Sequence, residues 1–208
     1  MTLFRRTVFL AAILWMSAAA SQAQDRMPEL APGQLTDAQR LAAQIFRDTR
    51  GVPVFGPFVP LIRSPDLMLA AKNMGDYLRY HNTLPLALNE FAILITAREW
   101  TQQLEWQIHY PLALKAGLKP AIADAVALGR KPDGMSDEED IVWQFSTELH
   151  QQKKVSDATY ARALAKFGDK GVIDMAGTNG YYDFLAQVMN ATQTAPDPKL
   201  PLLPVLQR

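Results

Sequence analysis

The chain has 208 residues, in which 21 Lys and Arg balance 21 Asp and Glu, with three His and no Cys. This length predicts one main domain that buries its own core, and the balanced charge lacks the basic surplus that a nucleic-acid partner requires. The absence of Cys excludes thiol nucleophiles, CxxC redox pairs, thiolate zinc sites and disulfides.

Residues 1–23 have the features of a signal peptide. Arg5 and Arg6 form a short basic region, residues 7–16 are apolar, and small residues precede a cleavage position after Ala23. The apolar run is too short to span a bilayer, which favours cleavage over an uncleaved membrane anchor. We therefore expect an exported protein, periplasmic or secreted, with no membrane attachment after cleavage. The Arg pair also suggests twin-arginine export, but its flanking residues match that signal poorly.

The rest of the sequence has the apolar periodicity of helices, and no stretch alternates convincingly as a strand does. We expect a flexible leader over residues 24–34, a helical domain over 35–193 and an extended Pro-rich tail over 194–208. Caps, Pro and Gly mark the ends of the helices. The predicted helices cover approximately residues 36–50, 65–80, 85–100, 101–116, 120–128, 136–151, 157–167 and 169–191.

One loop is unusually apolar. Residues 51–60 (GVPVFGPFVP) contain three Pro and two Gly, so we expect no helix there. Bulky apolar side chains in a loop normally pack onto the rest of the protein. The sequence favours a plug of the core, and the alternative interpretation is the wall of a pocket.

Glu105 and His109 lie four residues apart and therefore share one face of a predicted helix, with Gln102 one turn earlier on that face. A carboxylate beside an imidazole suits proton transfer near neutral pH. Alone, the pair is more often a solvated surface pair. Because Trp106 and its neighbours make this segment apolar nearly all round, we expect a buried helix whose polar groups need partners or a cavity.

Residues 88–118 (LNEFAILITAREWTQQLEWQIHYPLALKAGL) resemble the core of the carboxymuconolactone decarboxylase family, which includes the AhpD-like alkylhydroperoxidases. In the redox branch a Glu is followed twelve residues later by CxxC, and then by a His and a Gly. Here Glu90 matches the Glu and His109 matches the His, whereas Gln102 and Glu105 occupy the two Cys positions.

The resemblance continues through residues 155–191 and covers roughly 40–191. It implies an all-α, AhpD-like helical bundle. It also implies a homo-oligomer, trimer or hexamer, because members of the family pack helix pairs across symmetry axes.

The missing thiols exclude the disulfide and peroxide chemistry of the redox branch, even if a label of peroxiredoxin activity were attached by homology. The branch similar to γ-carboxymuconolactone decarboxylase needs neither thiol nor cofactor. The resemblance thus implies a cofactor-free lyase or isomerase that moves protons on a small carboxylated lactone or related acid. His109 would be the acid or base, Glu105 would orient it, and Glu90 would be the second proton-transfer group. The alternative is an exported binding protein that kept the pocket and lost catalysis.

An Arg that grips a substrate carboxylate is expected in such a site, because the planar guanidinium matches that anion. Arg98 and Arg79 are the candidates, although each also suits a structural ion pair. With Arg98, Gln102 and His81 form the predicted substrate-binding set. His81 lies between two predicted helices, where a capping role is the alternative.

Three further groups have simpler interpretations. Glu90, Glu105 and His109 are conceivable metal ligands, but without a second His nearby we expect neither a metal nor a cofactor. His150 ends a predicted helix, where we expect an exposed group favoured by the helix dipole. Tyr181 and its neighbour Tyr182 suit the core, or a hydroxyl contact with a ligand.

The spacing of Glu90 and Glu105 makes a geometric prediction. On one straight helix they would lie about 22 Å apart, too far to share a small substrate. The resemblance favours a break near residues 99–102, with Thr101 as the N-cap of the second helix. We then expect Glu90 within hydrogen-bond or one-water reach of His109 or Glu105, and turnover that depends on a group titrating near neutrality.

Overall fold

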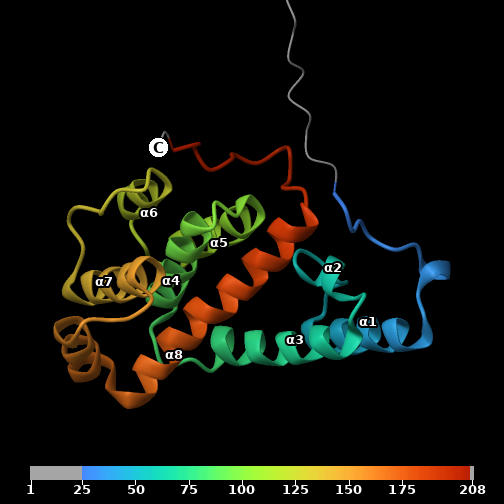
Figure 1. The fold of residues 1–208 in the computed structure, drawn as a ribbon, viewed down its shortest axis with the longest axis horizontal. Coiled ribbons are helices and arrows are strands. Elements are labelled where there is room, and N and C mark those ends of the chain that lie inside the picture. The colour runs from blue at the N-terminus through green and yellow to red at the C-terminus, as the bar shows by residue number, and fades with distance from the viewer. Residues whose placement is uncertain (1–24, 207–208) are drawn as a thin grey trace, which may run out of the picture.

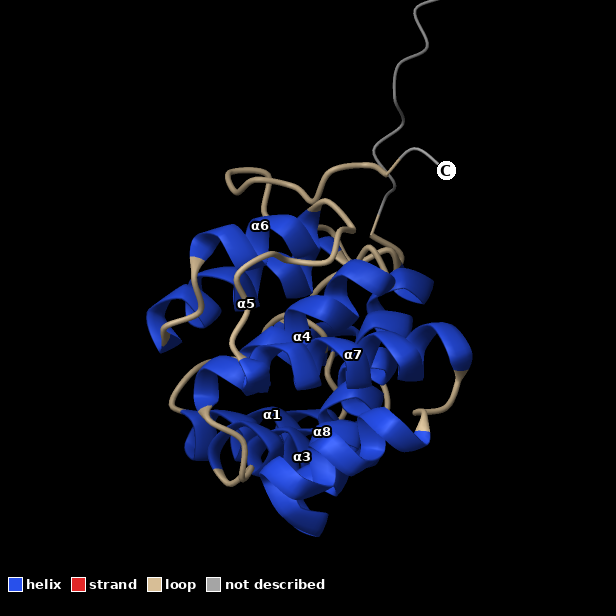
Figure 2. Cartoon of the chain, turned by 90° about the vertical axis from the view of Figure 1, so that its left-hand side faces the viewer, coloured by secondary structure: helices blue, strands red, loops and turns tan. Residues whose placement is uncertain are grey.

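The computed structural model describes residues 25–206, so the predicted signal peptide lies outside the described residues. Over this range the chain is helical and contains no strand (Figure 2), which confirms the all-α prediction. No helix in the described range is long and apolar enough to cross a membrane. The helices are η1 (Pro32–Gln34), α1 (Asp37–Arg50), α2 (Phe58–Leu61), α3 (Pro65–Tyr80), α4 (Leu86–Glu99), α5 (Gln103–Ala116), α6 (Pro120–Ala127), α7 (Asp137–Gln152) and α8 (Asp157–Thr192).

The ends of the helices follow the predicted caps. Thr36 and Ser136 each form a capping box at the start of α1 and α7. Pro65 is the first residue of α3, where its missing N–H costs nothing. Gly168 has φ 68° and ψ 177°, so α8 consists of two helical segments that meet at a kink. The separate helices predicted on either side of Gly168 are therefore confirmed.

The apolar loop contains one unexpected element. Residues 58–61 form the single helical turn α2, whereas the Pro and Gly content predicts no helix between Gly51 and Pro60. Pro57 is the N-cap and Pro60 the third residue of this turn. The first N–H groups of a helix have no partner within it, so neither Pro removes a bond that the turn needs.

Helix α4 is the centre of the molecule and packs against α5, α6, α7 and α8. Most of its side chains are buried, and they belong to two hydrophobic clusters. Leu94 packs among residues of α5, α6 and α7. Ile93 packs against the side formed by α1, α2, α3 and the second half of α8. In Figure 1, α8 crosses the molecule diagonally and reaches both sides.

The segments that flank the helical domain are attached to it. The backbone N–H of Arg26 donates to Thr192 O (2.8 Å) at the end of α8. In the tail, the backbone N–H of Asp197 donates to Gln107 Oε1 (2.9 Å) and that of Leu203 donates to Gln103 Oε1 (2.7 Å). The tail thus lies along α5, across the top of the view in Figure 1.

His150 is a correction to the sequence-based expectation. It is buried, with 4% of its surface exposed, and its Nε2 lies 3.0 Å from Thr96 Oγ1. Its Nδ1 lies 3.5 Å from Asp183 Oδ1. Burial lowers the pKa of His150, and this effect outweighs the negative charge of Asp183, which raises it. The expectation of an exposed group was wrong because α7 packs onto α4 and α8, so its inner face does not meet solvent.

Candidate functional site

The turn between α4 and α5 brings the predicted site together. Thr101 has φ 49°, and its N–H donates to Arg98 O (3.0 Å) while the N–H of Gln102 donates to Ala97 O (2.8 Å). This is the hydrogen-bond pattern of a helix that ends in a left-handed residue, a position that Gly usually occupies. The break predicted near residues 99–102 is confirmed, but the N-cap of α5 is Gln102 and not Thr101.

Because the chain turns back, Glu90 from α4 meets His109 from α5. His109 Nδ1 lies 2.7 Å from Glu90 Oε2, and His109 Nε2 lies 3.3 Å from Glu105 Oε2. Each of the three residues exposes no more than 3% of its surface. The predicted contact of Glu90 with His109 is therefore confirmed. We refer to Glu90, Glu105 and His109 as the His109 triad.

The two carboxylates of the triad are not equivalent. Glu90 makes the shorter contact with the His109 ring, so it fixes the orientation of the ring more strongly than Glu105 does. From the sequence, that orienting role is expected of Glu105. The second oxygen of Glu105, Oε1, is buried and has no hydrogen-bond partner among the described residues. Leaving a buried carboxylate oxygen unpaired is costly, so it marks a position where a ligand or water contributes a donor.

Glu105 and His109 border a small cavity of about 30 Å³. Helix α8 contributes Tyr181 and Tyr182, and the Tyr182 ring meets the His109 ring edge-on at a centroid distance of 5.0 Å. On the opposite side, Phe55, Pro57 and Phe58 come from the apolar loop and α2. The segment therefore fits both interpretations: Phe55 and Pro57 form part of the cavity wall, and Phe58 and Leu61 belong to the core, as the favoured plug interpretation predicts.

The triad holds charge at the cavity. Burial alone would lower the pKa of His109, but hydrogen bonds to Glu105 and Glu90, and their charges, raise it to about 9. The imidazole is therefore charged at neutral pH, in contrast to the expected titration near neutrality. Burial, together with the charge of Glu105, raises the pKa of Tyr182 well above its ordinary value, so its hydroxyl stays protonated.

Two Arg side chains border the same cavity, from α1 and α3. Arg50 is already paired with Asp76, at 2.8 Å. Arg79 makes no hydrogen bond or ion pair within residues 25–206. Burial disfavours its charge, but Tyr182, Tyr80 and the carboxylates of the triad raise the pKa of Arg79 above its ordinary value. Arg79 therefore offers a cationic group beside Glu105 and His109.

The predicted substrate-binding set does not join the triad. Gln102 Oε1 accepts the N–H groups of Leu104 and Glu105, which caps α5, and it borders a different cavity. His81 is an exposed residue at the C-cap of α3, as the alternative interpretation expected.

Arg98 also lies away from the triad. Its Nη1 donates to Ala127 O (3.1 Å) and Pro204 O (2.8 Å), at the end of α6 and in the tail. The physical reason is its position in α4, where the eight residues after Glu90 correspond to about 12 Å along the axis. Of the two candidate Arg residues, the structure brings only Arg79 to the cavity.

The triad does not form a metal site. Glu90 and Glu105 contact opposite nitrogens of the imidazole, so the three side chains do not converge on one point. No group of three or more His, Asp or Glu side chains in the described range could hold a metal ion.

Arg50 is a residue of the site that no sequence pattern indicates. It is the last residue of α1, where a basic side chain is expected simply to complement the helix dipole. Only the packing of α1 against α3 and of α2 against α8 brings it to the cavity, and no spacing within one helix predicts that. The two Tyr residues were predicted as core or as contacts of a ligand, and they lie both in the core and at the cavity.

Comparison with known proteins identifies the fold but no closer relationship. No family model matches the chain, and no curated protein matches it. A crystal structure from Ralstonia eutropha JMP134, described as an alkylhydroperoxidase AhpD core and an uncharacterized peroxidase-related protein, superposes with a TM-score of 0.65. The two share 20% sequence identity over 84% of this chain and 93% of the other. The chain therefore has the AhpD core fold.

Proposed function

We propose that this protein is an exported, carboxymuconolactone decarboxylase-like enzyme that moves protons on a small carboxylated lactone or related acid without a cofactor. The observation that carries the proposal is the His109 triad, a buried imidazole between two carboxylates at the edge of a cavity. Export rests on the predicted signal peptide alone.

Glu105 is the proposed proton acceptor. With its pKa at about 9, His109 is charged at neutral pH and cannot act as the base itself. Glu105 Oε1 has no partner among the described residues and belongs to a residue that borders the cavity. Glu90 fixes the ring of His109, and the charge of His109 stabilises the Glu105 carboxylate until substrate is bound.

The proposed chemistry balances without an external reagent. Glu105 Oε1 takes a proton from the carbon beside a carbonyl, and the electrons of the C–H bond move onto the carbonyl oxygen as an enolate. Return of the proton to another carbon of the enolate completes an isomerisation. In a decarboxylation, the bond to the carboxylate breaks, its electron pair moves onto the carbonyl oxygen as an enolate, and carbon dioxide leaves. The enolate carbon then takes a proton from water, which Glu105 relays.

Arg79 is the proposed carboxylate-binding residue, in place of Arg98. It borders the cavity with Glu105 and His109 and has no anionic partner in the described part of the chain. A guanidinium binds a carboxylate through two parallel hydrogen bonds. Arg50, held by Asp76, adds positive potential nearby.

The size of the cavity supports a second candidate function. At about 30 Å³ it admits water but not a lactone, so substrate entry requires the segment with Phe55 and Pro57 to move. If that segment closes over a ligand without exposing it to Glu105, the protein is a non-catalytic binding member of the same family.

Solvent-exchange NMR separates these functions. γ-Carboxymuconolactone and muconolactone are incubated with the protein in D₂O, and the loss of C–H signals and any release of carbon dioxide are followed. A proton-transfer enzyme exchanges or converts at least one of them, and Glu105→Gln abolishes this. The matched control His81→Gln removes an exposed His and leaves the rate unchanged. Ligand-induced shifts without exchange identify the binding protein. The absence of both shifts and exchange would contradict the proposal.

A further inference from the structure

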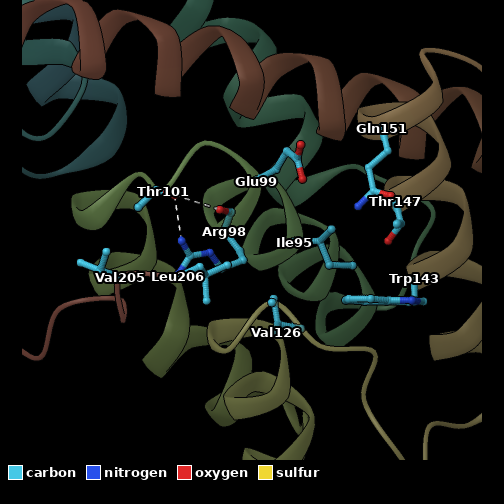
Figure 3. Close-up of a pocket in the computed structure, with 11 residues that line it drawn as sticks. Ile95, Arg98, Glu99, Thr101, Val126, Trp143, Thr147, Gln151, Val205 and Leu206 are labelled. Carbon is cyan, nitrogen blue, oxygen red and sulfur yellow. Dashed lines mark hydrogen bonds between the residues drawn. The ribbon is translucent and has the colours of Figure 1, made fainter. Parts of the chain in front are cut away.

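A second and larger cavity lies elsewhere in the fold. Its volume is about 390 Å³, and it is bordered by α4, α6, α7 and the end of the tail (Figure 3). It shares no bordering residue with the cavity at His109. Its walls are about half apolar, with side chains such as Ile95, Val126 and Trp143, and about half polar.

Arg98 supplies a buried cation at this cavity. Its exposed fraction is 8%, and its terminal nitrogens donate to Ala127 O, Pro204 O and Thr101 Oγ1. These acceptors are neutral, and no carboxylate within residues 25–206 forms an ion pair with it. Its Nε is buried and has no hydrogen-bond partner in that range. Because buried charges are normally paired, Arg98 favours an anionic ligand.

Thr147 supplies a second unsatisfied group. Its Oγ1 is also buried and has no partner among the described side chains and backbone. In Figure 3, Thr147 and Gln151 lie toward one end of the cavity and Arg98 toward the other, with Ile95 between them. The Arg98 guanidinium and the Thr147 hydroxyl are therefore placed to contact opposite ends of one ligand.

The surface between these ends suits a flat apolar body. The Trp143 ring borders the cavity and stacks against Phe91 at a centroid distance of 6.4 Å, which holds it in place. Aromatic rings pack favourably on such a surface. Glu99 also borders the cavity, and its negative charge favours the charged form of Arg98 but repels anions. Arg98 can therefore balance no more than one anionic group on a ligand.

We infer that this cavity binds a small aromatic monocarboxylic acid with a hydroxyl group at its far end. The carboxylate accepts the Arg98 Nε–H, the ring packs on Trp143, and the hydroxyl bonds to Thr147. This is a binding site separate from the His109 triad and independent of the function proposed for it.

Isothermal titration calorimetry with 4-hydroxyphenylacetate tests the proposal. We expect saturable binding of one ligand per chain. 4-Hydroxybenzyl alcohol, which lacks the carboxylate, should bind at least about tenfold more weakly, since hydrogen bonds to charged groups are the strong ones. Phenylacetate, which lacks the hydroxyl, should lose about three- to tenfold. No saturable binding at millimolar ligand, or equal binding of the alcohol, would overturn the assignment.

Variants locate the ligand. Thr147→Val keeps the side-chain shape and should weaken 4-hydroxyphenylacetate but not phenylacetate, whereas Thr49→Val, on α1, should change neither. Glu105→Gln, in the other cavity, should leave binding intact. Insensitivity to Thr147→Val, or loss of binding in Glu105→Gln, would place the ligand elsewhere and overturn the proposal.

Arg98 also holds the tail and α6, so its substitution alone cannot distinguish binding from folding. The direct readout is the Arg98 Nε–H signal in a ¹H–¹⁵N spectrum of the unmodified protein. We expect this signal to shift on addition of 4-hydroxyphenylacetate and not on addition of the alcohol. An unchanged signal at saturating ligand would overturn the role of Arg98.

Discussion

His109 is a buried imidazole whose two nitrogens both face carboxylates. If the ring were neutral, one of its nitrogens would present a lone pair to a carboxylate, and two buried negative charges would lie beside it with no cation between them. With the ring charged, Nδ1 donates to Glu90 Oε2 and Nε2 forms an ion pair with Glu105 Oε2. The mutual stabilisation of these three charges is the physical cause of the raised pKa of His109.

This raised pKa predicts a pH-dependent stability. Below the unfolded pKa of 6.5 the charged ring contributes its full stabilisation, and the contribution is lost as the pH rises through the folded pKa of about 9. Relative to His109→Gln, the protein should therefore lose up to about 3 kcal/mol of unfolding free energy between pH 6 and pH 10. Urea denaturation of both proteins across this range measures the difference.

A constant difference between the two proteins over that range would mean that His109 does not change its charge there. The corresponding comparison with His81→Gln serves as the control. His81→Gln removes an exposed His outside the triad, so it tests whether the effect is specific to His109.

At the scale of single residues, the sequence predicted the triad but not its surroundings. The spacing of Glu90 and His109 matches the family pattern, which predicts that they meet. Glu105 is predicted to join them because it lies one helical turn before His109. Arg98 and Arg79 could not be separated, because each is a basic residue near the end of a helix. Only the packing of α3 against α8, which brings Arg79 to the cavity beside His109, decides which of them reaches it.

At the scale of helices, α3 and α8 approach each other closely beside the site. A Cβ atom at Gly75 in α3 would lie 2.8 Å from Tyr181 Cζ, closer than such contacts allow. Tyr181 is also part of the cavity wall. The absence of a side chain at Gly75 therefore determines where this ring lies.

Gly75→Ala should destabilise the protein by about 1–3 kcal/mol, as expected when a group is forced into a packed core. Gly33→Ala is the matched control, because a Cβ atom at Gly33 would meet no other atom within 4 Å. Thermal or urea denaturation measures both. Equal effects of the two substitutions would contradict the close approach of α3 and α8.

The boundaries of most helices were predictable because caps, Pro and Gly mark them locally. Two local features could not be predicted: the left-handed backbone of Thr101 and the helical turn α2. Thr101 adopts the left-handed conformation that Gly usually supplies, and its hydroxyl accepts a hydrogen bond from Arg98 Nη2 (2.8 Å), a tertiary feature that no propensity reports. The turn α2 forms despite Pro57 and Pro60, because both occupy positions that need no N–H.

At the scale of the whole molecule, the tail leaves apolar side chains on the surface. The exposed fractions are 89% for Val205, 58% for Leu202 and 45% for Leu200. Exposed apolar groups that lie close together often mark an interface between chains. We propose that these residues belong to the interface of the homo-oligomer that the family resemblance implies.

We predict a trimer or hexamer in solution. Size-exclusion chromatography with multi-angle light scattering should give a mass three or six times that of the chain at micromolar concentration. Replacing Leu202 and Val205 together with Ser should shift the equilibrium toward the monomer. A monomeric mass for the unmodified protein would contradict the prediction.

The folded protein holds a charged His109 between Glu90 and Glu105, and the role proposed for Glu105 depends on this charge. Long-range ¹H–¹⁵N spectra of the His rings test it most directly, with His109 assigned by its loss in His109→Gln. We predict that both nitrogens of His109 are protonated at pH 7 and that the ring titrates near pH 9, while His81 in the same spectra serves as the exposed reference. A His109 ring that is neutral at pH 7 would contradict the charged state of His109 and the role proposed for Glu105.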